Sequence, residues 1–576
     1  MAKSQKFNSY NFAPKDVPMR PRFLYPLLIG LVAAIFFIPY LGGIHLFDWD
    51  EVNFAECARE MIMLGDYMRV YIDYLPFWEK PPFFFWLQAG AMHLFGIGEF
   101  AARFPNALCG VVTLIVLYRI GEKLYDTAFG LLWALAYFGS ILPNFYFRSG
   151  IIDPWFNLFI FLGMYHIILF HWKRDNYAHI ALRLPGSEWR YLLLSGFWVG
   201  MAMLTKGPVA LVIAGLCMAV YWVVVRFRWY INVPQILVFL LASSAVTFIW
   251  FGIETYNNGP WFVQTFLVYQ YRLFSTPDAG HAGFPGYHFV VLLLGCFPAS
   301  IFCLRAFFPQ LQQHLYQRNF KTWMIILFWV VLILFTIVKS KIVHYSSMCY
   351  FPLTFLGALT VHQIIEGKIN FTGWMRASLV VICSLFSAVV IALPLLSDEV
   401  AWIKSLIKND PFAQANLDAQ VSWSGWEGLT GGFFLITTVL GVVWLARPTH
   451  AWRGASTLFG GTAIVVLLIM YLYFPKIEPY TQGAAIEFFS GLAGKDCYTY
   501  TSGYRSYANY FYPRTKPNTR PAPPAGQDWE QHLFYGKVDK EVYVACKIYD
   551  ETRLDSVKTL KKLYAKNGFV FYKREK

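Results

Sequence analysis

The sequence predicts an all-α membrane protein that crosses the bilayer about thirteen times and ends in a small soluble α/β domain. Of its 576 residues, 57% are hydrophobic and only 14% are charged, whereas a soluble protein carries roughly a quarter charged residues. Apolar runs of about 18–20 residues, each long enough to cross a hydrocarbon core of about 30 Å, recur from residue 23 to residue 474. We therefore predict a membrane domain over residues 1–474 and a soluble domain over residues 475–576.

The loop charges predict how the chain is oriented in the membrane. Five Lys and Arg residues precede the first apolar run, which places the N-terminus in the cytoplasm by the positive-inside rule. An odd number of spans then places the C-terminal domain on the outer face. The predicted spans lie approximately at residues 23–41, 104–120, 127–143, 154–171, 190–205, 208–225, 234–252, 288–305, 322–338, 348–365, 374–396, 427–446 and 455–473.

The apolar segment 81–97 is predicted to lie on the membrane surface without crossing it. Counting it as a span would invert every later loop, so that the basic loops at Arg226, Arg228 and Arg447 would face outward. An amphipathic interfacial helix avoids this conflict. The segment then belongs to a long outer loop over residues 42–103.

The net charge of +14 does not indicate a nucleic-acid partner, because the basic residues are scattered through short loops between apolar runs. In the C-terminal domain, residues 496–504, 542–549 and 569–574 read as strands and residues 555–567 as a helix. The nine cysteines show no metal-binding spacing. Cys497 and Cys546 could pair if the domain faces an oxidising compartment.

Carboxylates collect in the outer loops of this topology. The first loop contains Asp48, Asp50 and Glu51 within four residues. One of the aspartates could cap the following helix, which Asp favours; three acids exceed what capping needs and could act as a general base or hold a metal. Asp153 lies just inside an apolar run, where a carboxylate is costly and a functional role is the default interpretation.

Cations occur in the same outer loops. At membrane depth they suit a phosphate, which Arg can bind through two parallel hydrogen bonds. A phosphate at the outer surface of a bilayer belongs to a lipid headgroup, and carboxylates beside it indicate chemistry at the neighbouring bond. The predicted phosphate-binding residues are Lys80, Lys206, Arg272, Lys341 and Tyr345.

Six motifs occur in an order that resembles a known family, the bacterial protein-O-mannosyltransferase-like glycosyltransferases, and within it the lipid A aminoarabinose transferase group. The resemblance covers about residues 20–365. The motifs are Asp50-Glu51 with AECAREM after it, Trp78-Glu79-Lys80-Pro81-Pro82, Glu99 to Pro105, Asp153, Thr205-Lys206-Gly207-Pro208 and Lys341-xxx-Tyr345. Two features depart from the pattern and leave the sugar and the acceptor open, namely Trp49 between two acids and the pair His344-Tyr345.

The resemblance implies a C-type glycosyltransferase fold and a polyprenyl-phosphate-linked sugar donor. It implies that Asp50 acts on the acceptor, that Asp153 lies near the sugar or phosphate, and that Lys80, Arg272 and Tyr345 contact the donor phosphate. With Glu51 added from the first loop, the predicted catalytic residues are Asp50, Glu51 and Asp153. No cofactor is required by this interpretation, although a divalent metal could be held by Glu79 and His281.

The predicted reaction transfers a sugar from the lipid-linked donor to a lipid A or other glycolipid, a glycan or a protein, in one inverting displacement. The predicted location is the outer face of a bacterial inner membrane, where membrane lipids surround the spans. One alternative is a secondary transporter, but the charges cluster at one membrane edge and no internal repeat is visible. A second is another membrane glycan polymerase or ligase, which would not share the first-loop acids followed by Trp78-Glu79-Lys80.

Overall fold

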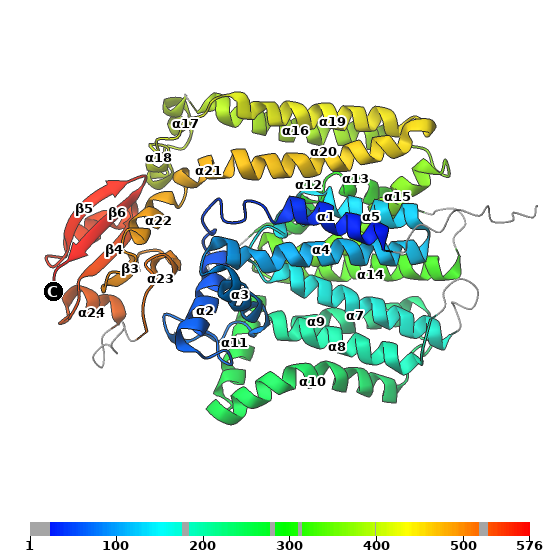
Figure 1. Ribbon diagram of the computed structural model, residues 1–576, viewed down its shortest axis with the longest axis horizontal. Coiled ribbons are helices and arrows are strands. Elements are labelled where there is room, and N and C mark those ends of the chain that lie inside the picture. Colours follow the sequence, from blue (N-terminus) through cyan, green and yellow to red (C-terminus); the bar gives the residue numbers. More distant parts are fainter. Residues whose placement is uncertain (1–22, 176–183, 277–282, 309–313, 398, 518–527) are drawn as a thin grey trace, which may run out of the picture.

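The computed structural model describes residues 23–175, 184–276, 283–308, 314–397, 399–517 and 528–576. A bundle of long helices forms most of the molecule, and a small sheet lies at one end of it (Figure 1). In the described residues, eight helices are long and apolar enough to cross a membrane. They span Glu99–Leu124, Asp153–Arg174, Val233–Asn258, Leu315–Ile337, Val343–Ile365, Gly373–Leu396, Trp426–Leu445 and Pro448–Tyr480.

A multi-pass helical membrane protein is therefore confirmed, whereas thirteen crossings stay a prediction. The pair α12 (Tyr287–Gly295) and α13 (Ala299–Ala306) passes the same test together but is bent by 115°, which gives up to nine spans. Shorter helices lie at the remaining predicted spans. These are α1 (Leu24–Phe37), α5 (Thr127–Phe138), α8 (Glu188–Lys206) and α9 (Val209–Val224).

Burial separates central helices from those at the lipid-facing side. The most apolar windows of α15 (Tyr350–Ile365, with the 3₁₀ turn before it) and α7 (Asp153–Arg174) are 94% and 83% buried. Those of α10 (Val233–Asn258) and α16 (Gly373–Leu396) are only 22% and 28% buried. Because the exposed faces of α10 and α16 are apolar, hydrocarbon is the solvent that suits them.

Two helices, α2 (Asp50–Leu64) and α3 (Phe83–Phe95), lie at the end of the bundle nearest the sheet (Figure 1). The thirteen residues of α3 extend for about 20 Å at 1.5 Å per residue, which is shorter than a hydrocarbon core. This length agrees with a helix that lies on the surface. Glu51 to Met61 of α2 are all buried, because the helix packs against both α3 and the C-terminal domain.

The C-terminal sheet has the strand order β3-β4-β6-β5. Strands β3 (Tyr498–Ser502) and β4 (Val542–Lys547) are parallel, and β6 (Phe569–Arg574) is antiparallel to both β4 and β5 (Lys561–Lys566). Three of these strands lie where the sequence predicts strands. The α/β character of this domain also agrees with the prediction.

The predicted helix over 555–567 is wrong. Only its first residue is helical, as the end of α25 (Glu551–Asp555), and residues 561–566 form the edge strand β5. Asn567 and Gly568 both have positive φ, 46° and 78°. An Asn-Gly pair between two strands is the strongest short-range signal for a hairpin turn, and it outweighs the helical spacing of the apolar residues.

All nine cysteines are free and buried. Cys546 is the partner of Ser502 in the parallel pair of β3 and β4, whereas Cys497 precedes β3. Five residues along a strand separate the two thiols by roughly 16 Å. The possible Cys497–Cys546 disulfide is therefore not formed, because a disulfide needs Cα atoms less than about 7 Å apart.

Candidate active site

A cavity of about 630 Å³ lies where the ends of several bundle helices meet the segment 42–103 and the C-terminal domain. Acidic and basic side chains from segments far apart in the sequence line it together. The polar and charged residues that carry the following argument are Asp48, Asp50, Glu51, Glu79, Lys80, Asp153, Lys206, Tyr269, His344, Tyr345 and Arg505. Most of the residues that the sequence singles out thus meet at one place.

Two carboxylates of the cavity flank one imidazole. The Nε2 atom of His344 lies 3.5 Å from Oδ2 of Asp50 and 3.9 Å from Oδ2 of Asp153. Asp50 and Asp153 are the first residues of α2 and α7, where the helix dipoles favour negative charge. Asp50 does not cap α2, because the cap position is Trp49 and no side chain accepts a capping hydrogen bond. The Asp50 carboxylate is 32% exposed and faces the cavity.

Lys206 pairs with the more buried of these carboxylates. Its Nζ donates to Oδ1 of Asp153 at 2.6 Å. The ammonium also lies 5.2 Å from the ring centre of Tyr345, within reach of a cation–π contact. Lys206 ends α8, and Gly207 follows with φ of +106°, a conformation that favours glycine. The Thr205-Lys206-Gly207-Pro208 motif therefore turns the chain and directs the lysine toward Asp153.

A second cation lies against an aromatic ring that sequence reasoning missed. Nζ of Lys80 donates to the hydroxyl of Tyr269 at 3.1 Å. Arg272 lies one turn later on the same helix, α11 (Trp261–Ser275), with its guanidinium carbon 5.2 Å from the Tyr269 ring centre. Arg272 is exposed and is not among the residues that line the cavity, which it approaches only through its contact with Tyr269. Tyr269 and Arg272 are three residues apart, so they lie on the same face of the helix, and this spacing was the signal that could have identified Tyr269.

Glu51 holds the local structure. Its two oxygens accept from Nε and Nη2 of Arg103 at 3.1 and 2.8 Å, and both side chains are only 2% exposed. The backbone N–H groups of Phe47 and Gly150 also donate to this carboxylate. With both oxygens in use, Glu51 is a positioning residue and does not share the setting of Asp50.

Lys341 also differs from the predicted role. Its ammonium donates to the carbonyl oxygens of Phe335, Thr336 and Val338 at 2.9, 2.6 and 2.5 Å, at the C-terminal end of α14 (Leu315–Ile337). All three N–H donors are thereby used, and a cation at this end is favoured by the helix dipole. We therefore assign Lys341 to the end of α14 and not to a phosphate.

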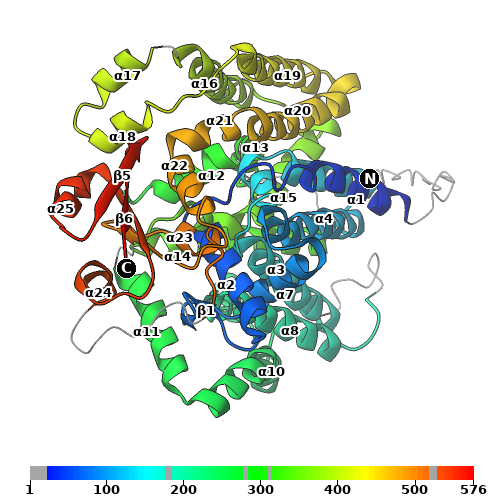
Figure 2. The same cartoon turned by 60° about the vertical axis from the view of Figure 1, so that its left-hand side comes forward.

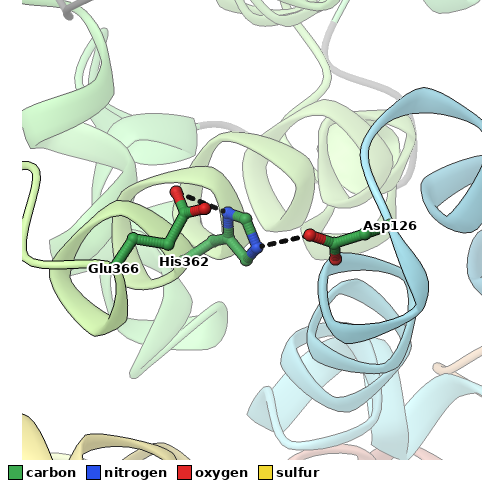
Figure 3. Close-up of side chains that lie close together, drawn as sticks. All are labelled: Asp126, His362 and Glu366. Atoms are coloured by element: carbon green, nitrogen blue, oxygen red, sulfur yellow. Dashed lines mark ion pairs between the residues drawn. The ribbon is translucent and has the colours of Figure 1, made fainter. Parts of the chain in front are cut away.

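Of the two predicted metal ligands, Glu79 lines the cavity and His281 lies outside the described residues. A different group in the described ranges, Asp126, His362 and Glu366, is close enough to hold an ion. Figure 3 shows the imidazole between the two carboxylates, each about 3.4–3.5 Å from one ring nitrogen. A hydrogen bond from His362 lowers the pKa of Asp126. One ring nitrogen faces each acid, so the imidazole bridges the two carboxylates.

Arg505 was missed by the sequence interpretation because no motif surrounds it. It reaches the cavity from the C-terminal domain, which Figure 2 shows beside α2. Only the folding of that domain onto α2 and the residues before it brings Arg505 there. No local pattern in the sequence carries this information.

Comparisons with known proteins agree with this fold and cavity. Residues 79–251 match the family model for dolichyl-phosphate-mannose-protein mannosyltransferases. An undecaprenyl phosphate-α-4-amino-4-deoxy-L-arabinose arabinosyl transferase of Photorhabdus laumondii is 25% identical over 65% of this chain and 68% of its own length. The enzyme of the same name from Erwinia tasmaniensis is 24% identical over 77% of this chain and 75% of its own length.

The fold has close counterparts among solved structures. The crystal structure of ArnT from Cupriavidus metallidurans bound to undecaprenyl phosphate superposes with a TM-score of 0.74, at 16% identity, over 96% of this chain and 98% of that one. The apo form of the same protein gives a TM-score of 0.70.

Fold, cavity and relatives together define a membrane glycosyltransferase of the C-type class, which confirms the family and the enzyme class that the motifs predict. Within that class, the chain is similar to the undecaprenyl phosphate-aminoarabinose arabinosyl transferases. This similarity extends from the membrane helices into the C-terminal sheet, because the structural match covers nearly the whole chain.

Proposed function

We propose that this enzyme transfers an aminoarabinose-type sugar from undecaprenyl phosphate to lipid A or a related glycolipid on the outer face of the inner membrane. The observation that carries the proposal is the arrangement of charges in the cavity. Asp50 and Asp153 both contact His344. Lys206 pairs with Asp153, and Lys80 lines the same cavity. Carboxylates can act on an acceptor, and cations can stabilise a leaving phosphate. The names of the relatives supply the sugar and its carrier.

The reaction follows from this arrangement as a single displacement. An acceptor oxygen attacks the anomeric carbon while the bond from that carbon to the phosphate oxygen breaks. Asp50 takes the acceptor proton, or orients an acceptor that is already anionic. Lys80, with Tyr269 and Arg272 behind it, stabilises the departing polyprenyl phosphate. Because one displacement occurs, the configuration at the anomeric carbon is inverted.

Asp153 and Lys206 line the part of the cavity that we assign to the sugar. Their ion pair fixes a carboxylate next to His344, and Tyr345 packs against the same ammonium. The second oxygen of Asp153 faces His344, so that an amino group on the sugar would find a negative partner there. We assign Asp153 to sugar binding and Lys206 to holding Asp153, with a share in binding phosphate.

We also propose that the N-terminus is cytoplasmic, that the chain divides near residue 475, and that the C-terminal domain is outside. Leu94 on α3 and Trp229 after α9 are 77% and 64% exposed, and every native cysteine is buried. A membrane-impermeant maleimide should therefore label Leu94→Cys in intact spheroplasts and should label Trp229→Cys only after lysis. The opposite labelling pattern would invert the topology.

The function itself is tested by mass spectrometry of outer glycolipids. A strain that lacks this chain should lose one sugar from lipid A and accumulate the undecaprenyl-linked sugar, and the intact gene should restore both. Purified enzyme should reproduce the transfer in detergent from the two lipids alone. If the glycolipids are unchanged and the purified enzyme transfers nothing, the proposed reaction is incorrect.

Lys80→Ala should weaken the binding of undecaprenyl phosphate. Losing a hydrogen bond to a charged group costs about 1.5–3 kcal/mol, which is roughly a 10–150-fold higher Kd. We expect a smaller effect for Arg272→Ala, since Arg272 is exposed and stands behind Tyr269. Arg228→Ala, an exposed cation in the loop after α9, is the matched control. Unchanged Kd values for Lys80→Ala would remove Lys80 from the phosphate site.

A further inference from the structure

The C-terminal domain is fixed to the loop that leads into Asp50. The backbone N–H of Leu46 donates to the hydroxyl of Tyr512 at 2.9 Å, and that of Asp48 donates to the side chain of Gln482 at 2.9 Å. These bonds hold the chain on either side of Phe47, which lines the cavity. The position of Asp50 therefore depends on contacts with the domain at the far end of the sequence.

Apolar packing and an ion pair make this attachment firm. Val52 and Ala55 of α2 belong to one buried cluster with Phe488 and Phe571 of the C-terminal domain. Nearby, the carboxylate of Glu478, which follows α21 (Phe474–Ile477), accepts from His45 at 2.7 Å and raises the pKa of that imidazole. The C-terminal domain is thus packed firmly against the chain that leads into Asp50.

One side chain of the C-terminal domain, the guanidinium of Arg505, reaches the cavity. Arg505 follows β3, and its guanidinium carbon lies 5.2 Å from the ring centre of Trp49 and 5.5 Å from that of Tyr507. The two rings meet edge to face at 5.7 Å. Arg505 is exposed, lines the cavity, and makes no hydrogen bond or ion pair with any residue that the structure describes.

This setting differs from that of the other cations of the cavity. Lys206 is paired with Asp153, and Lys80 donates to Tyr269 on α11. Arg505 instead keeps its N–H donors available while two aromatic rings restrict its plane. A guanidinium held in this way is suited to binding a phosphate through two parallel hydrogen bonds.

We propose that Arg505 forms a binding site for a phosphate group of the acceptor glycolipid, which the C-terminal domain adds to the cavity. This inference rests on the proposed function, in which a reaction joins two lipids. The donor phosphate is served by Lys80, in the loop just before α3, and by the residues behind it on α11. Arg505 belongs to the outer domain and flanks Trp49, so it faces an acceptor that approaches from outside the cavity.

Arg505→Ala should raise the KM for diphosphorylated lipid A by about tenfold to a hundredfold, the usual effect of losing charge-assisted hydrogen bonds. The Kd for undecaprenyl phosphate and the melting temperature should stay unchanged. Direct binding of lipid A to the purified protein without donor should weaken by the same factor. Arg505→Lys should recover only part of the affinity, because Lys lacks the planar fork. Lys537→Ala removes an exposed charge from the same domain, away from the cavity, and should have no effect.

The measurements with lipid A and with undecaprenyl phosphate distinguish the possible outcomes. Weaker binding of undecaprenyl phosphate in Arg505→Ala, with the KM for lipid A unchanged, would assign the arginine to the donor and overturn the proposal. Unchanged values for both lipids would overturn it as well. If wild-type protein transfers no sugar to lipid A, the proposed function fails, whereas the donor-free binding measurement still decides whether Arg505 holds this phosphorylated lipid.

Discussion

Asp50→Asn should lower the rate of sugar transfer by about 10²–10⁴-fold if the acceptor is a hydroxyl group, which is the usual contribution of general-base catalysis. A hydroxyl has a high pKa and needs a base to take its proton as it attacks. Asp50 lines the cavity, is partly exposed, and has His344 as its neighbour at 3.5 Å. The Kd for undecaprenyl phosphate should stay unchanged, because the donor phosphate lies with other residues.

The size of the loss identifies the acceptor atom. A phosphate oxygen is already anionic at neutral pH, so an acceptor phosphate would need orientation and little proton removal. The loss for Asp50→Asn would then be smaller, unless Asp50 and Glu79 hold a metal, in which case a chelator should reproduce the defect. Single-turnover measurements with purified lipid A separate these cases. Because Asp50 does not cap α2, full activity of Asp50→Asn would remove it from the catalytic residues.

The sequence predicted the cavity because topology alone brings helix ends together. Asp153 begins α7 and Lys206 ends α8, so the two residues lie at the same end of two consecutive helices that pack together. In the structure, Nζ of Lys206 donates to Oδ1 of Asp153 at 2.6 Å, as this placement allows. Asp50 follows the first span in the same way. Residues at span boundaries are thus readable from hydropathy and charge.

Contacts between distant segments were not readable. Arg505 enters the cavity only through the packing of α2 against the C-terminal domain, which no local pattern encodes. Lys341 has the same sequence context as the other outer cations, yet its donors bond to the end of α14. Strand β5 was predicted as a helix because the apolar residues in 555–567 have helical spacing, although the Asn567-Gly568 turn favours a hairpin.

Arg103→Met should be the most destabilising single change near the cavity. It leaves the Glu51 carboxylate buried without its partner, and removing one member of a buried ion pair costs about 3–5 kcal/mol. Arg103 also donates to the carbonyl oxygens of Leu41, Ile44 and His45, each at 2.8 Å. These bonds fix the chain that enters α2, so Asp50 should lose its position as well.

The melting temperature in detergent measures this effect, and a double variant separates its causes. In Glu51→Gln/Arg103→Met neither of these two positions holds a buried charge, so the melting temperature should recover part of the loss seen in Arg103→Met. The recovery is partial, because the three carbonyl oxygens stay without their donor. Glu51→Gln alone should be destabilising while Asp50→Asn is not, since Asp50 is partly exposed. A Glu51→Gln protein that melts like wild type but is inactive would instead make Glu51 a catalytic residue.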